Sequence, residues 1–191
     1  MEITAGILHG MPLKAPAGLD VRPTAVRARQ ALFDSLGDLS GKVFADLCAG
    51  SGAMGLEAAS RGAASVLFAE CAPASIAAIR FNCRRAGKAG LTADLEIVEG
   101  ALPHSIAHLA ARPRPHIVFA DPPYRLSADL LSQVTGDARF AQWAGGAVLI
   151  WELPAETRGL RPPGSAWKIL AIRTLGPADF LFLTGKENRE P

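Results

Sequence analysis

The chain has little of what marks secreted or membrane-spanning proteins. Its 191 residues contain three cysteines, Cys48, Cys71 and Cys83, which lack C-x-x-C spacing, so we expect free thiols rather than disulfides or a zinc site. No apolar run approaches the roughly 18 residues of a membrane helix. The N-terminus lacks the basic and apolar parts of a signal peptide. These absences predict one compact cytoplasmic domain that does not enter a membrane.

The chain also lacks a large excess of positive or negative side chains. The formal net charge is +2 and the pI is near 8.6, so any nucleic-acid partner must be held by local basic patches rather than by a global positive field. His104 and His108 have the i, i+4 spacing of helical metal ligands, but no third ligand is apparent in the sequence. We therefore expect no metal site.

What the chain does contain is a glycine fingerprint in the right setting. Gly50, Ser51, Gly52 and Gly55 spell G-x-G-x-x-G between a short apolar run and a helix-forming stretch. The next apolar run ends at Glu70, 18 residues after Gly52, where a carboxylate can grip ribose hydroxyls. This pattern predicts a cofactor that contains adenosine, either a dinucleotide or S-adenosylmethionine.

Charge favours the second cofactor. Asp46 stands at the strand tip just before the glycine loop, where its carboxylate would repel the pyrophosphate of a dinucleotide. The same carboxylate would attract the cationic amino and sulfonium groups of S-adenosylmethionine. A bound S-adenosylmethionine is therefore the better match.

Asp121-Pro122-Pro123-Tyr124 follows another apolar run and is suited to holding a planar amine. The Asp121 carboxylate and a backbone carbonyl can accept two hydrogen bonds from one amino group, and Tyr124 offers a ring for stacking. The prolines restrict the backbone, so the turn has few ways to move. Two acceptors on one amine would aim its lone pair at an electrophile. An ordinary strand-to-loop turn is the competing interpretation.

Apolar runs alternate with helical patterns along most of the chain, which predicts an α/β fold with a mostly parallel sheet covered on both faces. Strands are expected at 42–47, 65–70, 94–98, 116–120, 146–152, 166–174 and 179–184, and helices at 53–62, 73–88, 102–110 and 127–143. The last two strands are joined by a link too short for a crossover, so they must be antiparallel. Seven strands with one reversed is the Rossmann-like arrangement of class I methyltransferases.

Residues 1–40 precede the predicted catalytic domain, 41–191, and are expected to form a small hairpin and a helix. In this extension Arg22, Arg27 and Arg29 are candidate contacts to RNA phosphates, although a solvated helix face is the simpler explanation of such arginines by themselves. A second basic row, Arg80, Arg84 and Lys88, repeats every four residues along a later predicted helix.

The combined motifs resemble the RsmD family, bacterial 16S ribosomal RNA guanine-N2 methyltransferases. The residues that carry the resemblance are Arg22-Pro-Thr24, Ala31-Leu-Phe33, the loop from Asp46 to Ala63, Asp121-Pro-Pro-Tyr124, Trp151-Glu152 and Arg173-Thr-Leu-Gly176. They span essentially the whole chain. The resemblance implies methyl transfer from S-adenosylmethionine to the exocyclic amine of one guanine in small-subunit RNA, within an assembled or assembling particle.

The resemblance also implies roles for individual residues. Asp121, Pro122 and Tyr124 would hold the target base, Asp46 the methionine end of the cofactor and Glu70 its ribose. Gly100 takes the place of an Asp that contacts the adenine amine in the family, so we expect adenine to meet backbone groups near Gly100 and Ala101, or Glu99. The expected cofactor site comprises Asp46, Cys48, Gly50, Ser51, Gly52, Glu70, Cys71, Gly100 and Ala101.

Two alternatives remain. A DNA adenine-N6 methyltransferase uses the same Asp-Pro-Pro-Tyr logic, but such enzymes commonly carry a sizeable target-recognition segment, for which 191 residues leave little room. A Rossmann-type nucleotide-binding module without catalysis would need neither Asp121 nor Tyr124.

Overall fold

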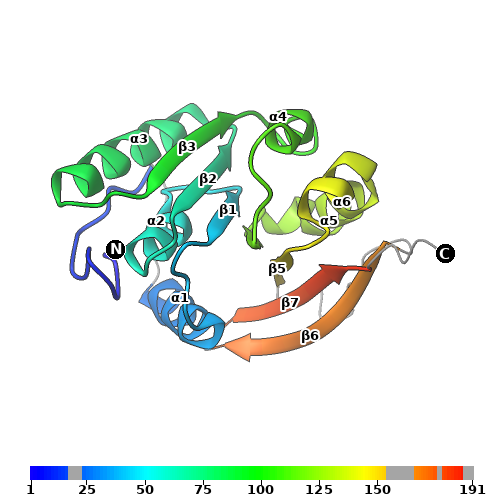
Figure 1. Cartoon of the computed structure of the whole chain (residues 1–191), viewed down its shortest axis with the longest axis horizontal. Helices are drawn as coiled ribbons and strands as arrows, with labels where there is room; N and C mark the ends of the chain where they lie inside the picture. Colours follow the sequence, from blue (N-terminus) through cyan, green and yellow to red (C-terminus); the bar gives the residue numbers. More distant parts are fainter. Residues whose placement is uncertain (17–22, 154–165, 176–177, 187–191) are drawn as a thin grey trace.

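The computed structural model describes residues 1–16, 23–153, 166–175 and 178–186, which form a seven-stranded sheet between two layers of helices (Figure 1). The strands are β1 (Val43–Leu47), β2 (Ser65–Glu70), β3 (Asp94–Glu99), β4 (Ile117–Ala120), β5 (Val148–Leu153), β6 (Trp167–Leu175) and β7 (Ala178–Gly185). The helices are α1 (Pro23–Leu36), α2 (Ala53–Ser60), α3 (Pro73–Lys88), α4 (Ile106–Ala110), α5 (Ser127–Gly136) and α6 (Ala138–Ala144), with a 3-10 turn, η1 (Tyr124–Leu126). The predicted α/β fold is confirmed.

The strand order is β3-β2-β1-β4-β5-β7-β6, and only β7 runs against the others. Six parallel strands plus one reversed strand were predicted from the connection lengths, and this arrangement is confirmed. The order reverses direction between β1 and β4, which are neighbours in the sheet. Open α/β sheets bind ligands at such a switch point, beyond the carboxyl ends of the strands.

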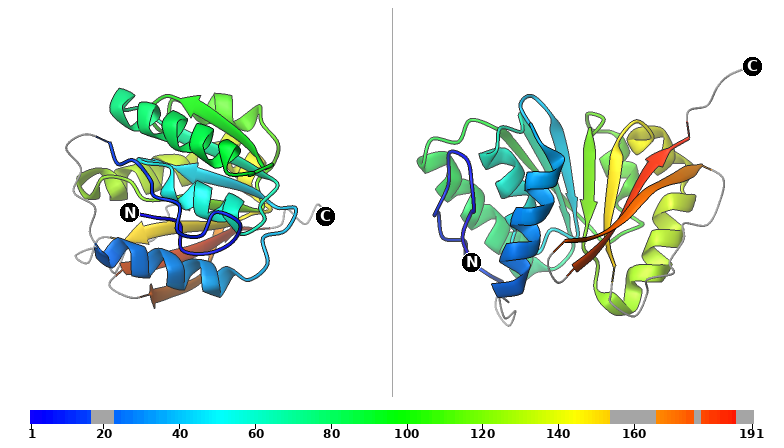
Figure 2. Two further views of the ribbon diagram at one scale, coloured as in Figure 1. Left: turned by 90° about the vertical axis from the view of Figure 1, so that its left-hand side faces the viewer. Right: turned by 90° about the horizontal axis from the view of Figure 1, so that it is seen from below.

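Alternating side chains build one hydrophobic core on each face of the sheet. Phe44 of β1 packs with apolar residues of α1, α2 and α3, whereas Ala45 and Leu47 pack with those of α4, α5 and α6. The right-hand view of Figure 2 shows these two helical layers on opposite sides of the sheet. Asp46 has the same parity as Phe44, so its side chain points toward the α1–α3 layer.

The N-terminal segment packs on the same layer. Its two arms run antiparallel, joined by one isolated bridge, Glu2 with Pro12, and by hydrogen bonds from the Ile3 N–H to the Met11 carbonyl at 3.0 Å and from the Leu13 N–H to the Met1 carbonyl at 2.9 Å, which agrees with the small hairpin that the sequence predicted. Gly6 approaches α2 so closely that a Cβ would lie 1.8 Å from the Ser60 carbonyl oxygen. Ile3 and Leu8 are buried in the core that α1 and α2 share. The segment is therefore integrated into the fold around the sheet.

Two predicted helices are shorter than expected. The predicted helix 127–143 is divided at Asp137, whose Oδ1 accepts hydrogen bonds from the N–H groups of Arg139 at 2.8 Å and Phe140 at 3.2 Å and so caps α6. The predicted helix 102–110 begins only at Ile106. In the described ranges, none of the helices is long and apolar enough to cross a membrane.

Candidate active site

Three acidic side chains stand next to one another where β1, β4 and β5 end. Ala120 pairs with Leu47 on one side and with Trp151 on the other. Asp121 and Glu152 each lie one residue beyond these pairs, while Asp46 lies one residue before Leu47. Neighbouring strands are about 4.8 Å apart, so Asp121 and Glu152 lie side by side at the sheet edge. Asp46 is opposite Phe119 and so lies two residues before the level of Asp121 on the neighbouring strand. We call Asp46, Asp121 and Glu152 the acid row.

The acid row belongs to one face of the sheet. Phe119 and Ile150, two residues before Asp121 and Glu152, pack in the same core as Phe44. By strand alternation, Asp46 and Glu152 point to this face, and Asp121 continues the direction of Phe119. The N–H of Gly55 in α2 donates to Asp46 Oδ2 at 2.9 Å, which places Asp46 beside the glycine loop.

The surroundings of the acid row penalise negative charge. Burial raises the pKa of Asp46 well above its ordinary value, with further repulsion from Asp121 and Glu70, against the Gly55 hydrogen bond. Desolvation by the surrounding protein raises the pKa of Asp121 to about 6, although the residue is exposed to solvent at the sheet edge. Burial, and then repulsion from Asp121, raises the pKa of Glu152 to about 8. Among the residues that the structure describes, no cationic side chain forms an ion pair with any of the three.

The glycine loop has the geometry that its fingerprint predicts. Gly50 and Gly52 adopt φ values of +56° and +76°, which favour glycine. A Cβ on Gly55 would lie 2.3 Å from the Phe68 ring, so this glycine lets α2 pack closely on β2. A Cβ on Gly50 would meet no atom within 4 Å, so space is open beside the loop. Cys48 has φ +61° without being glycine, which makes the backbone before the loop strained.

Glu70 has a second task besides the predicted ribose contact. Its Oε2 accepts from the Gly50 N–H at 2.7 Å, and its Oε1 accepts from the N–H groups of Cys71 and Ala72 at 2.7 and 2.9 Å. Glu70 therefore fastens the glycine loop to the end of β2. Since a carboxylate oxygen can accept two hydrogen bonds, Oε2 retains capacity for a ligand hydroxyl.

The other predicted cofactor residues surround this loop. Burial and the nearby carboxylates raise the pKa of Cys48 to about 12, which suits a packed thiol rather than a nucleophile. The Ser51 carbonyl accepts a hydrogen bond from Asn82 Nδ2 at 2.9 Å, so α3 anchors the glycine loop. The Gly100 N–H donates to the Glu70 carbonyl at 2.9 Å, which brings the exposed Ala101 to the same edge.

The Asp-Pro-Pro-Tyr turn leaves β4 toward solvent. The Asp121 N–H lies 3.4 Å from the Leu47 carbonyl, which continues the β1–β4 pairing by one step. Pro122 is buried and fixes the turn, whereas Tyr124 begins η1 and is 57% exposed. The structure thus brings Asp121 and the glycine loop to one edge, with an accessible aromatic ring beside Asp121.

One predicted RNA contact is corrected. Arg29 is 4% exposed, its Nε lies 3.3 Å from Glu57 Oε2, and its guanidinium also donates to the Glu2 carbonyl. It holds α1, α2 and the N-terminal segment together and is not available to a phosphate. Arg27 is exposed on α1, and Arg22 lies outside the described residues.

Sequence reasoning missed one structural acid and one acid of the candidate site. Glu57 is fully buried and joins Arg29, Arg61 and Thr4, although the sequence offers only a glutamate in a helical run. Glu152 was noted only as part of the family resemblance. The signal for its role is the order of β4 and β5 in the sheet, which sets it beside Asp121.

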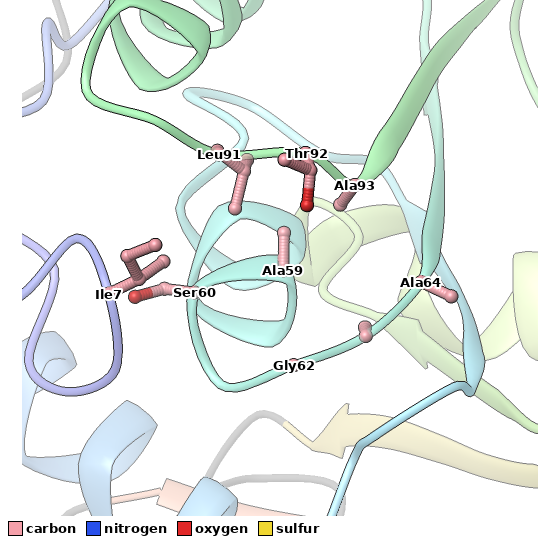
Figure 3. Close-up of a pocket in the computed structure, with 9 residues that line it drawn as sticks. Ile7, Ala59, Ser60, Gly62, Ala64, Leu91, Thr92 and Ala93 are labelled. Atoms are coloured by element: carbon pink, nitrogen blue, oxygen red, sulfur yellow. The ribbon is translucent and has the colours of Figure 1, made fainter.

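A hollow of about 400 Å³ lies elsewhere, between the N-terminal segment, the end of α2 and the loop before β3 (Figure 3). The residues that line it are mostly apolar and include Ile7, Ala59 and Leu91. Residues that precede β2 and β3 border it, so it belongs to the amino edge of the sheet. It contains none of the predicted site residues.

Comparisons with known proteins point to one family. The family model described as Conserved hypothetical protein 95 matches residues 1–179. Ribosomal RNA small subunit methyltransferase D of Escherichia coli strain K12 is 31% identical over 178 residues, which are 92% of this chain and 85% of that protein. A solved structure named "Putative methyltransferase yhhF from Escherichia coli" has a TM-score of 0.75 and 28% identity, and the match covers 97% of this chain and 98% of the other. An RNA methyltransferase from Salinibacter ruber in complex with S-adenosyl-L-homocysteine shares the fold, with a TM-score of 0.59, 18% identity and coverage of 90% and 97%.

Proposed function

The chain belongs to the Conserved hypothetical protein 95 family, the RsmD family of ribosomal RNA methyltransferases, and we propose that it methylates the N2 amine of a guanine in 16S ribosomal RNA. S-adenosylmethionine is the methyl donor. The observation that carries the proposal is the position of Asp121 at the tip of β4, directly beside the strand that enters the glycine loop.

The residues at this edge fit the cofactor. The space beside Gly50 is open to a ligand, and Glu70 keeps hydrogen-bonding capacity for a ribose hydroxyl. Asp46 is buried without a cationic partner in the described part of the chain, and the amino group of the cofactor would supply one. Gly100 and Ala101 lie at the same edge for the adenine.

The chemistry needs a positioned amine. S-adenosylmethionine supplies an electrophilic methyl group on a positively charged sulfur. Asp121 accepts a hydrogen bond from the exocyclic amine and so directs the nitrogen lone pair toward that methyl group, while Tyr124 stacks on the base. When the N–C bond forms, the bond between the methyl group and sulfur breaks, S-adenosylhomocysteine is the leaving group, and the nitrogen loses a proton. A carboxylate whose pKa is raised to about 6 can accept this proton better than an ordinary aspartate.

RNA is held beyond the sheet edge. Arg29 pairs with Glu57, and further along both segments Asp34 pairs with Arg61, so α1 and α2 run in the same direction. The part of α1 that precedes Arg29 therefore points toward the start of α2. The start of α2 lies at the glycine loop. Arg27 is exposed near this end and is suited to a phosphate, and the remaining contacts are expected from small-subunit RNA in an assembled or assembling particle.

Identification of the methylated nucleoside tests the proposal. The protein is incubated with tritiated S-adenosylmethionine and either undermethylated small subunits, naked 16S ribosomal RNA or DNA. We expect label in N2-methylguanosine from the ribosomal substrates. Label in N6-methyladenine of DNA would support the DNA methyltransferase instead, and binding of S-adenosylhomocysteine without any transfer would support a non-catalytic module.

A further inference from the structure

Glu152 is a half-buried acid for which the reaction described above has no role. It lies at the tip of β5, next to Asp121, and pairs with Phe180 of β7 in the sheet register. Within the described ranges its carboxylate accepts no hydrogen bond and meets no cation. A buried carboxyl group without partners costs stability, so a partner supplied by a ligand would compensate for a real penalty.

The neighbouring residue defines which part of a ligand Glu152 meets. If Asp121 holds the exocyclic amine, the next position along the sheet edge faces a ring nitrogen beside that amine. On guanine these nitrogens are N3, which presents a lone pair, and N1, which carries a hydrogen and is therefore the one that a carboxylate can bind. On 2-aminopurine, the analogue that keeps the amine at C2, and on adenine, the adjacent N1 is a hydrogen-bond acceptor. A carboxylate can accept from guanine but would face a lone pair on the other two bases.

We propose that Glu152 recognises the target base by accepting a hydrogen bond from guanine N1–H. This role rests on the proposed methylation of guanine N2. Asp121 and Glu152 then form two adjacent acceptors for the two adjacent donors of the Watson–Crick edge. Extruded bases are commonly read through hydrogen bonds to this edge together with stacking. Glu152 is thus a residue that determines specificity, and Asp121 remains the residue that positions the amine.

The charge environment agrees with this role. The groups that face Glu152 are Asp121 from β4, with Asp46 one strand further, and the apolar Phe180 from β7. This setting raises the pKa of Glu152 to about 8. A donor from guanine would stabilise the carboxylate form in the complex. Above about pH 8 the ligand-free side chain is also ionised and cannot donate to a lone pair, so a base that presents a lone pair is rejected most strongly there.

The test varies the group at N1 of the base and replaces the Glu152 carboxylate by an amide. A synthetic RNA that spans the guanine labelled by the wild-type protein is prepared with guanine, 2-aminopurine or 1-methylguanine at that position, and kcat/KM is measured above about pH 8 for wild type and Glu152→Gln. 2-Aminopurine lacks both the N1 hydrogen and O6, whereas 1-methylguanine keeps O6 and lacks only the N1 hydrogen. The glutamine amide can donate to a lone pair on N1. We expect wild type to prefer guanine over 2-aminopurine by roughly 100-fold or more. Glu152→Gln should lower this ratio at least about tenfold while affinity for S-adenosylhomocysteine stays unchanged.

Glu96→Gln is the matched control. It makes the same carboxyl-to-amide change on β3, where Glu96 is paired with Arg112 away from the acid row, and it should keep the wild-type ratio. An unchanged ratio in Glu152→Gln would overturn the proposal. Methylation of 1-methylguanine by the wild-type protein at the rate of guanine would also overturn it, and this measurement needs no variant to fold. If wild type labels no guanine N2 at all, the proposed function fails, and the role of Glu152 fails with it.

Discussion

Glu57 and the acid row lie on the same side of the sheet, but their carboxylates are satisfied in different ways. Glu57 is fully buried and accepts from the N–H and hydroxyl groups of Thr4, at 2.8 and 2.6 Å, and it forms ion pairs with Arg29 and Arg61. The acid row has one protein hydrogen bond, from Gly55 to Asp46, and no cationic partner in the described part of the chain. The first set completes its interactions within the fold, and the second leaves them to a ligand.

This difference separates structural from functional charge. Breaking a complete buried network leaves other groups unpaired, so it should cost stability. Removing an acid whose pKa is raised by burial should instead relieve a penalty and cost activity, as perturbed groups in a cleft commonly do. Arg29 shows the distinction, because it is basic and near the RNA side but belongs to the Glu57 network.

The largest stability effect is expected from Glu57→Ala. Loss of this carboxylate leaves the buried Arg29 without its acid and Thr4 without two acceptors, so the free energy of unfolding should fall by about 3–5 kcal/mol. Urea denaturation measures the change. Glu96→Ala removes a glutamate from an exposed pair with Arg112 and should cost at most about 1 kcal/mol. Equal losses in the two variants would remove the structural role of the Glu57 network.

Glu70→Ala should weaken the cofactor. The variant loses a ribose partner and three hydrogen bonds that fasten the glycine loop, so the Kd of S-adenosylhomocysteine should rise roughly 10- to 100-fold, as measured by titration calorimetry. Glu96, on the neighbouring strand β3, is paired with Arg112 and is not among the predicted cofactor contacts. Glu96→Ala should therefore change the affinity little, and a rise in Kd equal to that of Glu70→Ala would remove the specific role of Glu70.

The ligand-free protein should lose stability as the pH rises, in part because of Glu152. The pKa of Glu152 is about 8 in the fold against an ordinary value of 4.5. The stabilising contribution of its protonated form is complete below about pH 4.5 and is lost as the pH rises toward 8. Between these limits wild type should lose roughly 1–3 kcal/mol more than Glu152→Gln. Parallel pH profiles of the unfolding free energy would mean that Glu152 is not destabilised by its surroundings.

The smallest effect is expected from Arg27→Gln. If Arg27 contacts one phosphate, the log–log salt dependence of binding to small-subunit ribosomal RNA should become shallower by about 0.7–0.9, and binding of S-adenosylhomocysteine should not change. Arg114 is exposed just before β4, at the amino edge, and Arg114→Gln provides the same charge change away from the site. A salt slope that changes equally in both variants would indicate a general charge effect.

Local sequence patterns were sufficient to predict most of the fold and half of the candidate site. The glycine fingerprint and the turn from Asp121 to Tyr124 are contiguous, and each follows an apolar strand, so their positions at strand tips could be predicted. The break of the predicted helix 127–143 also has a local signal, because Gly136 is typical of a helix end and Asp137 of an N-cap, but the prediction continued the helix through both residues.

Contacts between distant segments account for the other errors. Arg29 is buried because α1 lies against α2, and the residue spacing within α1 does not contain that information. The relation of Glu152 to Asp121 depends on β4 and β5 being neighbours in the sheet. Such pairings are fixed by tertiary packing rather than by local propensity.

Single-turnover methyl transfer by Asp121→Ala, measured beside its affinity for S-adenosylhomocysteine, tests most directly whether the acid row is the active site. The substrate is the small-subunit RNA that wild type labels. We predict a rate at least about 100-fold lower, because the positioning acceptor and the proton acceptor are lost together, with cofactor affinity within about twofold of wild type. A near-normal rate in this variant, with the same nucleoside labelled, would contradict the account.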